Sequence, residues 1–338
     1  MKKAMNKKQM LASLKLAAKT VSDTTIKNQI KKLISENHTK QEIEIGSRSI
    51  AYAFIRKEYP IQPIDIRGQY IYIDNTVETI QFSIFTFTVK DIVKRETDVF
   101  AGFNEGGNIK LGNMFSFSKV YGSDYFVSMR YGIVQGTCGK YCMGCKEECY
   151  VKHSYRHNSV IDCHARNTLA FKADIEKAFD DLKKQIDSKR DKPLFVRVDQ
   201  SGEIESEKEF KLWVEMAREY KNIQFYLYTK AFSLVMPTLN IYSEKGILPN
   251  NITILFSIWH EYGIKAYKQF EHLPQVKAFV VLDNVWNEAK YKEYGLHVTT
   301  TCKAYNEKGK LDHNITCERC RKCFNRIARH KVIGCYEH

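Results

Sequence analysis

Seven of the ten cysteines in this 338-residue sequence fall into two short clusters. The first cluster holds Cys138, Cys142, Cys145 and Cys149, and the second holds Cys317, Cys320 and Cys323. Thiolates packed this closely are usually neutralised and fixed by a metal ion or an iron–sulfur cluster. The sequence therefore predicts two thiolate-rich metal sites.

The overall composition fits a protein with metal sites in a reducing compartment. Hydrophobic residues make up 43% of the chain, enough for a large core. No stretch reaches the roughly 18 consecutive apolar residues of a membrane span, and the start, MKKAMNKKQM, lacks the features of a signal peptide. We expect a cytoplasmic protein without membrane association, in which disulfides explain ten cysteines poorly.

Positive charge is concentrated at the two ends of the chain, which has a net charge of +14. Residues 1–45 hold ten lysines against four acids, and residues 302–338 hold nine Lys or Arg against four acids. Basic ends suit a polyanionic partner, and we expect DNA or RNA. The alternative is a set of lysine-rich faces that serve only solvation.

The first third of the chain changes from helical to strand periodicity. Apolar residues recur at helical spacing over 7–21 and 24–35, which predicts a basic helical hairpin. The segment 61–93 alternates with period two and predicts strands around a turn at Asp74 and Asn75. We expect a basic helical region over 1–60 and a small β-rich segment over 61–110.

From residue 169 onward, helices and short apolar strands alternate. A long amphipathic helix from Leu169 to Ile186 leads to a series of strands at 193–200, 222–229, 252–259, 276–284 and 297–301, with helices between them. Short, continuous apolar strands are typical of parallel sheets buried on both faces. This pattern predicts an α/β fold of parallel βα repeats over 111–301, either a full or partial barrel or an open sheet, followed by a cysteine-cluster module over 302–338.

Polar residues stand where these strands end, the place at which parallel α/β folds bind ligands. They are Asp199, Ser201, Gly202 and Glu203, then Thr229 and Lys230, Ser257 and His260, Asp283 and Asn284, and Thr300 and Thr301. Each could instead cap the next helix. No GxGxxG or GxxxxGK[ST] loop follows any strand, so the sequence does not indicate dinucleotide or P-loop chemistry.

The spacing Cys138-x3-Cys142-x2-Cys145, in the loop 138–149 before the βα series, resembles the radical S-adenosylmethionine superfamily. The resemblance implies a partial TIM barrel and a 4Fe–4S cluster held by these three cysteines, whose open iron binds S-adenosylmethionine for reductive cleavage to a 5′-deoxyadenosyl radical. It also implies that Ser201, Gly202 and Glu203 contact that cofactor. Gly144 replaces the aromatic residue usual before the third cysteine, and Cys149 is an additional thiol.

A second likeness covers the chain from about residue 111 to its end. The segments LGNMFSFSK, VRVDQSGE and FYLYTK, with Arg166-Asn167 and the helix of Trp213, resemble the phage family called gene product 88. That family implies a phage or plasmid context without an assigned activity, and its spacing would select Cys138, Cys145 and Cys149. The two resemblances agree on Cys138 and Cys145 as ligands. They differ on whether Cys142 or Cys149 is the third.

Cys317, Cys320 and Cys323 have the Cys-x2-Cys-x2-Cys spacing of a bacterial ferredoxin run. The fourth ligand would be Cys302 or Cys335, and we prefer Cys302 because the related phage proteins carry a cysteine there. Four thiolates would form a closed site for structure or electron transfer. Zinc is the alternative metal at both clusters, since it also accepts four thiolates. Cys163 and His164, in the following helix, are expected to pack without ligating a metal.

Two functional hypotheses follow. The first is a radical S-adenosylmethionine enzyme that modifies a nucleic acid or nucleotide, with one or two 4Fe–4S clusters and with Arg197, Asp199 and Lys230 as further cofactor or substrate contacts. The second is a nucleic-acid-binding protein in which zinc or iron–sulfur centres serve only the fold. The sequence indicates neither a substrate nor an oligomeric state.

Overall fold

The structure, a computed structural model, describes residues 6–21, 24–40, 42–43, 46–47, 50, 61–63, 71–73, 79–82, 85–88, 99–105, 111, 114–123, 125–128, 131–142, 145, 149–155, 157–191, 193–282, 287–304, 312, 314–324 and 331–336. The chain divides into two compact units. The first comprises residues 1–100, 123–136 and 150–175, and the second comprises 101–122, 137–149 and 176–338. The domain boundaries expected from the sequence stay predictions.

The first unit begins with the predicted helical hairpin. Helix α1 (Lys7–Thr20) starts at a capping box in which Asn6 and Gln9 exchange hydrogen bonds between side chain and backbone. Helix α2 (Thr24–Ser35) packs against it, and the two bury Leu14, Ile26 and Ile30 among other apolar residues. The 3.6-residue period of these side chains is what places them on one face of each helix.

Two short antiparallel pairs follow, in the segment where strands were predicted. Strand β1 (Ile61–Pro63) pairs with β2 (Ile71–Ile73), and β3 (Thr79–Phe82) pairs with β4 (Phe85–Thr88). Asp74 and Asn75 lie outside the described residues, so the turn expected there stays a prediction.

The first unit also contains the antiparallel pair β7 (Tyr125–Ser128) and β8 (Gly132–Gln135), with helices α5 (Val151–Ser154) and α6 (Asn158–Ala173). Helix α6 is joined to this pair by a 2.6 Å hydrogen bond from Ser128 Oγ to Asp162 Oδ1. The predicted long helix over Leu169–Ile186 is wrong, because the extended backbone of Asp174 separates α6 from α7 (Ile175–Asp187).

The second unit is built on an eight-stranded sheet in the order β13-β14-β12-β11-β10-β9-β6-β5. Its strands are β5 (Asn104–Glu105), β6 (Phe115–Ser116), β9 (Phe195–Val198), β10 (Gln224–Thr229), β11 (Ile252–Ile258), β12 (Val276–Val281), β13 (Thr300–Thr301) and β14 (Val332–Cys335). All neighbouring pairs are parallel except β5 with β6. Among the described residues the sheet is open, with β13 and β5 at its edges. The mixed α/β fold with parallel strands is thus confirmed at this level.

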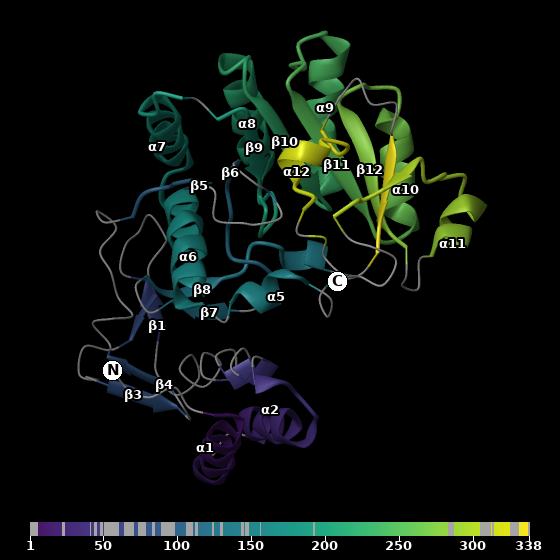
Figure 1. Cartoon of the computed structure of the whole chain (residues 1–338). Coiled ribbons are helices and arrows are strands. Elements are labelled where there is room, and N and C mark those ends of the chain that lie inside the picture. The colour runs from purple at the N-terminus through teal and green to yellow at the C-terminus, as the bar shows by residue number, and fades with distance from the viewer. Residues whose placement is uncertain are drawn as a thin grey trace. The chain divides into compact units, whose positions relative to one another are not determined.

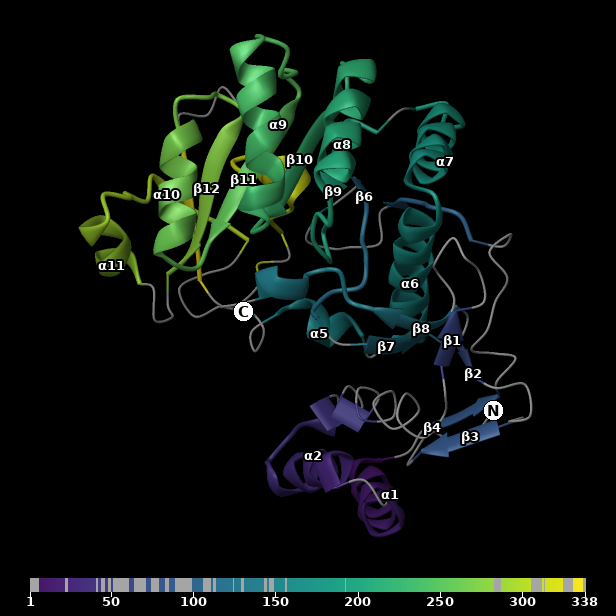
Figure 2. The ribbon, with the colours of Figure 1, turned by 180° about the vertical axis from the view of Figure 1, so that it is seen from behind.

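Helices cover one face of this sheet. Helices α8 (Glu207–Glu219), α9 (Phe232–Glu244) and α10 (Glu261–Phe270) lie on the face turned toward the viewer in Figure 2. Trp213 of α8 is fully buried there, with ring centroids 4.7 Å from Phe179 and 5.4 Å from Phe117. Helix α11 (Glu288–Glu293) follows β12. This arrangement places the strands' other face, which we call the inner face, away from α8, α9 and α10.

The inner face is covered by the C-terminal part of the chain. The short helix α12 (Cys317–Cys320) lies on this side of the sheet, in front of β10 and β11 in Figure 1. A buried apolar cluster joins it to the strands and consists of Leu111, Met114, Phe195, Tyr226, Leu255, Phe324 and Ile333. The C-terminal residues therefore complete the core of the second unit.

One strand was absent from the sequence prediction. Strand β14 lies between β12 and β13, so the expected neighbours 276–284 and 297–301 do not pair with each other. All four residues of β14 are buried. At Gly334 an added Cβ would lie 2.6 Å from Leu282 Cδ1 and 3.1 Å from Val298 Cγ1, so a larger residue would require Leu282 to move. No helix in the described part of the chain is long and apolar enough to cross a membrane.

We predict that Gly334→Ala lowers the free energy of unfolding by about 1–3 kcal/mol, because its methyl group would overlap Leu282 in a packed interior. Urea denaturation measures the change. Thr301→Ala, at an exposed position on the neighbouring strand, is the control and should change stability by less than about 0.5 kcal/mol. Equal stability of both variants would contradict the close packing of β14.

Candidate functional site

A network of backbone hydrogen bonds at the carboxyl ends of β6 and β9, which we call the seam, holds Cys138 in place. Residues 117–122, which continue β6, bond to the end of β9 through Phe117 N to Arg197 O (2.8 Å) and Lys119 N to Ser201 O (2.8 Å). On its other side the same segment accepts hydrogen bonds from the loop that carries Cys138, with Cys138 N donating to Gly122 O (3.0 Å). Gly122 N in turn donates to the Cys138 thiol at 3.2 Å.

Gly202 allows this close approach. Its φ of +89° is unfavourable for residues with a side chain, and an added Cβ would lie 2.6 Å from Thr137 Oγ1 and 2.9 Å from Lys119 Cβ. The Thr137 hydroxyl donates to Val120 O (2.9 Å) and accepts from Glu203 N (3.1 Å). The Ser-Gly-Glu segment thus lies directly against the residue that precedes Cys138.

Lys119 is a fully buried cation beneath this seam. Its ammonium donates to Glu203 O (2.7 Å) and to the Glu209 carboxylate, and it lies 3.7 Å from Asp199 Oδ2. Burial alone would lower the pKa of Lys119, but the nearby Asp199 and Glu209 carboxylates outweigh that effect and raise it. The lysine therefore stays charged and joins β6, the loop after β9 and helix α8.

Asp199 is the strained residue of the site. It is 3% exposed, has a positive φ of 44°, and neither of its carboxyl oxygens accepts a hydrogen bond. Burial raises the pKa of Asp199 against the opposing influence of Lys119. Left-handed backbone at a non-glycine residue costs free energy and is concentrated at functional sites.

Three thiols of the first cluster lie together. The 3₁₀ turn Gly139–Cys142 folds back so that the Cys142 thiol lies beside the thiols of Cys138 and Cys145, and the Cys138 thiol above all raises the pKa of Cys142. The Cys145 thiol lies 3.9 Å from Cys142 O. The neighbouring Cys142 thiol and burial raise the pKa of Cys145. A hydrogen bond of 2.8 Å between Tyr141 OH and Ser233 Oγ ties this turn to the start of α9.

Lys230, which follows β10, supplies the positive charge of this group. It is half-buried beside the thiols of Cys145, Cys138 and Cys149. Desolvation lowers the pKa of Lys230, but Cys145 and the Glu203 carboxylate outweigh that effect and raise it. Cys149 thus borders the group, while Cys142 lies within it. No three ligand side chains in the described ranges stand close enough to hold a single metal ion without moving.

The Glu203 carboxylate joins the ends of β9 and β10. One oxygen accepts from Thr229 Oγ1 (2.7 Å) and Ile204 N (2.9 Å), and the other accepts from Lys230 N (2.7 Å). Glu203 is 2% exposed, and Ser201 is buried with its hydroxyl bonded to Lys119 O. The structure therefore brings Ser201, Gly202, Glu203 and Lys230 to the first cysteines, as their strand-end positions predicted.

Arg197 lies elsewhere, on the inner face beside the second cluster. Its guanidinium stacks 3.7 Å above the centre of the Tyr228 ring. Tyr228 is in hydrogen-bonding contact with the Cys323 thiol. Cys302, Cys317, Cys320 and Cys323 all line one small cavity, whereas Cys335 is buried in β14 and bonds to Tyr336 O.

The remaining candidates have structural roles or lie outside the described residues. His260 caps α10 by accepting from Gly263 N, as the alternative reading of strand-end residues allowed. His164, in α6, is buried and in contact with Tyr155 OH at 3.1 Å, and burial lowers the pKa of His164 to about 3. Asp283 and Asn284 are not among the described residues.

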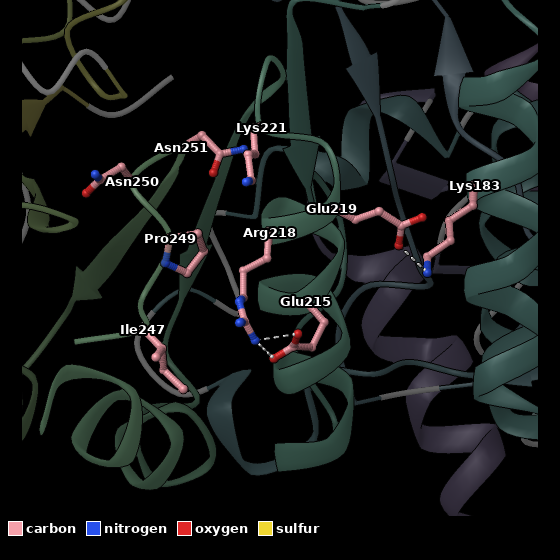
Figure 3. Close-up of a pocket in the computed structure, with 9 residues that line it drawn as sticks. All are labelled: Lys183, Glu215, Arg218, Glu219, Lys221, Ile247, Pro249, Asn250 and Asn251. Carbon is pink, nitrogen blue, oxygen red and sulfur yellow. Dashed lines mark hydrogen bonds and ion pairs between the residues drawn. The ribbon is translucent and has the colours of Figure 1, made fainter. Parts of the chain in front are cut away.

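A hollow of about 870 Å³ lies at the opposite ends of the strands. It is lined by charged residues that pair with each other, such as Arg218 with Glu215 and Lys183 with Glu219 (Figure 3). Asn251 Nδ2 there donates to Ala217 O and Tyr220 O and so stabilises the end of α8. In βα folds this end of the sheet serves stability, so we assign it no chemistry.

Sequence reasoning missed Lys119, Thr137 and Glu209. The one available signal was a lysine inside the otherwise apolar and small segment MFSFSKVYG. Its partners lie 84 and 90 residues away, in Glu203 and Glu209, so local pattern could not identify them.

Comparison with known proteins gives one result. The sequence model of a family described as Gene product 88 matches residues 103–326, a range that includes both cysteine clusters and the segments that form the seam. No curated protein and no solved structure matches the chain.

We predict that Lys119→Met lowers the free energy of unfolding by about 3–5 kcal/mol, because it leaves buried carboxylates without their cation. Adding Glu209→Gln should recover about 1–3 kcal/mol of that loss in a double-mutant cycle. The control is Lys183→Met, which removes a partly exposed ion pair and should cost less than about 1 kcal/mol. Additive effects of Lys119→Met and Glu209→Gln would contradict the network.

Proposed function

We propose that this chain, which belongs to the Gene product 88 family, is an iron–sulfur enzyme of the radical S-adenosylmethionine type. It would derive from a phage or mobile element and act on a nucleic acid or nucleotide. In this proposal, Cys138, Cys142 and Cys145 hold the catalytic 4Fe–4S cluster in a partial βα barrel.

One observation carries the proposal. The three thiols gather at the carboxyl ends of neighbouring parallel strands, directly against the Ser201-Gly202-Glu203 segment of the next strand. Three thiolates suit a four-iron cluster with one open coordination position, and this donor set fits the group better than a closed zinc site would. When bound, such a cluster supplies the electron for reductive cleavage of S-adenosylmethionine.

The surrounding residues support that chemistry by charge and by exclusion of water. Three thiolates bring negative charge into a buried region, and the ammonium of Lys230 offsets it at close range. The Glu203 carboxylate is held by three hydrogen bonds, so it fixes the two strand ends on which a bound cofactor would rest. The Glu203 N–H and C=O are already bonded to Thr137 and Lys119, so the backbone of Gly202 beside it is the candidate for a cofactor contact.

The nucleic-acid part of the proposal is supported by the N-terminal hairpin. Helices α1 and α2 contain no acidic residue, and their outer faces expose Lys7, Lys8, Lys15, Lys19, Lys31 and Lys32. A cationic surface of this kind attracts the phosphate backbone. The alternative, a non-catalytic nucleic-acid-binding protein whose metal centres serve only its fold, would have the same cationic surface. The two hypotheses differ in whether the thiols hold a catalytic cluster.

We predict that the anaerobically purified and reduced protein produces 5′-deoxyadenosine from S-adenosylmethionine, and that Cys142→Ser abolishes production because it removes a cluster ligand. Cys163→Ser, in α6 and outside the thiol group, is the matched control and should retain the activity. Product is quantified by chromatography and mass spectrometry.

Three outcomes oppose the proposal at this site. Loss of activity in Cys149→Ser with full activity in Cys142→Ser would show that Cys149 is the third ligand, as the phage-family spacing implies. Iron without 5′-deoxyadenosine in the unmodified protein would show that the cluster does not catalyse this reaction. Zinc in place of iron, with nucleic-acid binding retained, would select the non-catalytic alternative.

We also predict that Lys15→Glu/Lys19→Glu weakens binding to a fluorescent oligonucleotide and lowers the slope of log affinity against log salt by about 2, roughly one per lysine. Fluorescence anisotropy at several salt concentrations measures both quantities. Lys221→Glu/Lys245→Glu makes the same change in net charge at exposed positions in the second unit and is the control. Equal loss in both variants would show that only net charge matters.

A further inference from the structure

We infer that Cys302, Cys317, Cys320 and Cys323 form a second, closed iron–sulfur site on the inner face of the sheet. The inference goes beyond the proposed function, since it concerns other residues and requires no catalysis. It assigns four thiolate ligands to one 4Fe–4S cluster and excludes Cys335.

Three local structural features bring the four thiols together. Thr316 caps α12 by accepting from Arg319 N, which sets the start of the helix that carries Cys317 and Cys320. Arg321 then adopts a left-handed conformation, with φ 57°, and turns the chain toward Cys323. Cys302 comes from the end of β13, where its N–H donates to Gly334 O at 2.7 Å.

The four cysteines border a common space. Together with Tyr226, Tyr228, Thr316, Phe324 and others they line a cavity of about 20 Å³, which is room for roughly one water molecule. The cavity lies beneath α12 and against β10 and β14, and apolar side chains form most of the remaining wall. Half-buried thiols that line one apolar-walled space are suitable ligands for a soft metal.

The spacing along the chain indicates the class of metal centre. Cys317, Cys320 and Cys323 have the Cys-x2-Cys-x2-Cys spacing of a bacterial ferredoxin run, and Cys302 lines the same cavity and supplies the fourth thiolate of a closed site. Zinc, which also accepts four thiolates, is the alternative that the measurement of sulfide distinguishes.

Positive charge surrounds the site and would offset a cluster carrying four thiolates. The Arg197 guanidinium and the Lys277 ammonium both act on Cys323, and Lys322 is anchored to Thr300 at the end of β13.

Both sites adjoin the end of β10. Tyr228, near Cys323, lies in this strand, and Lys230, near Cys138 and Cys145, follows it.

The experiment uses the full chain in a background that lacks the first site. In Cys138→Ser/Cys142→Ser/Cys145→Ser protein, purified without oxygen, we expect about four irons and four sulfides per chain. Adding Cys320→Ser or Cys302→Ser should abolish both, whereas adding Cys335→Ser should leave them unchanged. Iron, sulfide and zinc are measured on the same samples, and circular dichroism checks that each variant is folded.

Several results would overturn the inference. One zinc per chain without sulfide would show that the site binds zinc and not an iron–sulfur cluster. No bound metal would show that these cysteines form no metal site. Loss of iron in Cys335→Ser with retention in Cys302→Ser would reverse the ligand assignment. Where a variant fails to fold, the Mössbauer spectrum of the unmodified protein decides: it should contain a four-iron component with complete cysteine ligation, and its absence contradicts the inference.

Discussion

The buried ammonium of Lys119 is the interaction on which the rest of the second unit depends. It bonds to the Glu203 carbonyl and the Glu209 carboxylate and lies near Asp199, so one cation connects strand β6, the loop after β9 and helix α8. A buried charge is stable only when it is fully partnered. The positions of its partners are therefore fixed, and the seam that carries Cys138 is held in place with them.

The two cysteine sites use the same sheet in different ways. The first thiols lie on a loop at the strand ends, where Lys230 and Glu203 surround them. The second thiols come from the chain's C-terminal part, which covers the inner face and contributes β14 to the sheet. Cys138 and Cys142 of the first site are buried, whereas Cys302, Cys317, Cys320 and Cys323 of the second are half-buried.

The sequence predicted the parallel βα order well because short apolar runs such as 252–258 can be buried on both faces only in such a sheet. It also predicted that Ser201, Gly202, Glu203 and Lys230 would meet at the strand ends. It failed at β14, whose four residues are too few for a period to be read. It failed again at Asp174, where an extended residue divides two helices of similar amphipathic pattern. Lys119 was out of reach because its charge is balanced by residues more than 80 positions away.

The central claim is that Cys138, Cys142 and Cys145 hold a cluster with an open iron beside Gly202 and Glu203. Electron paramagnetic resonance of reduced Cys317→Ser/Cys320→Ser protein, with and without S-adenosylmethionine, tests it most directly, because only the first site then contributes. The account predicts a four-iron signal whose g values shift when S-adenosylmethionine is added. A signal that is identical with and without the cofactor, or no iron signal at all, would contradict it.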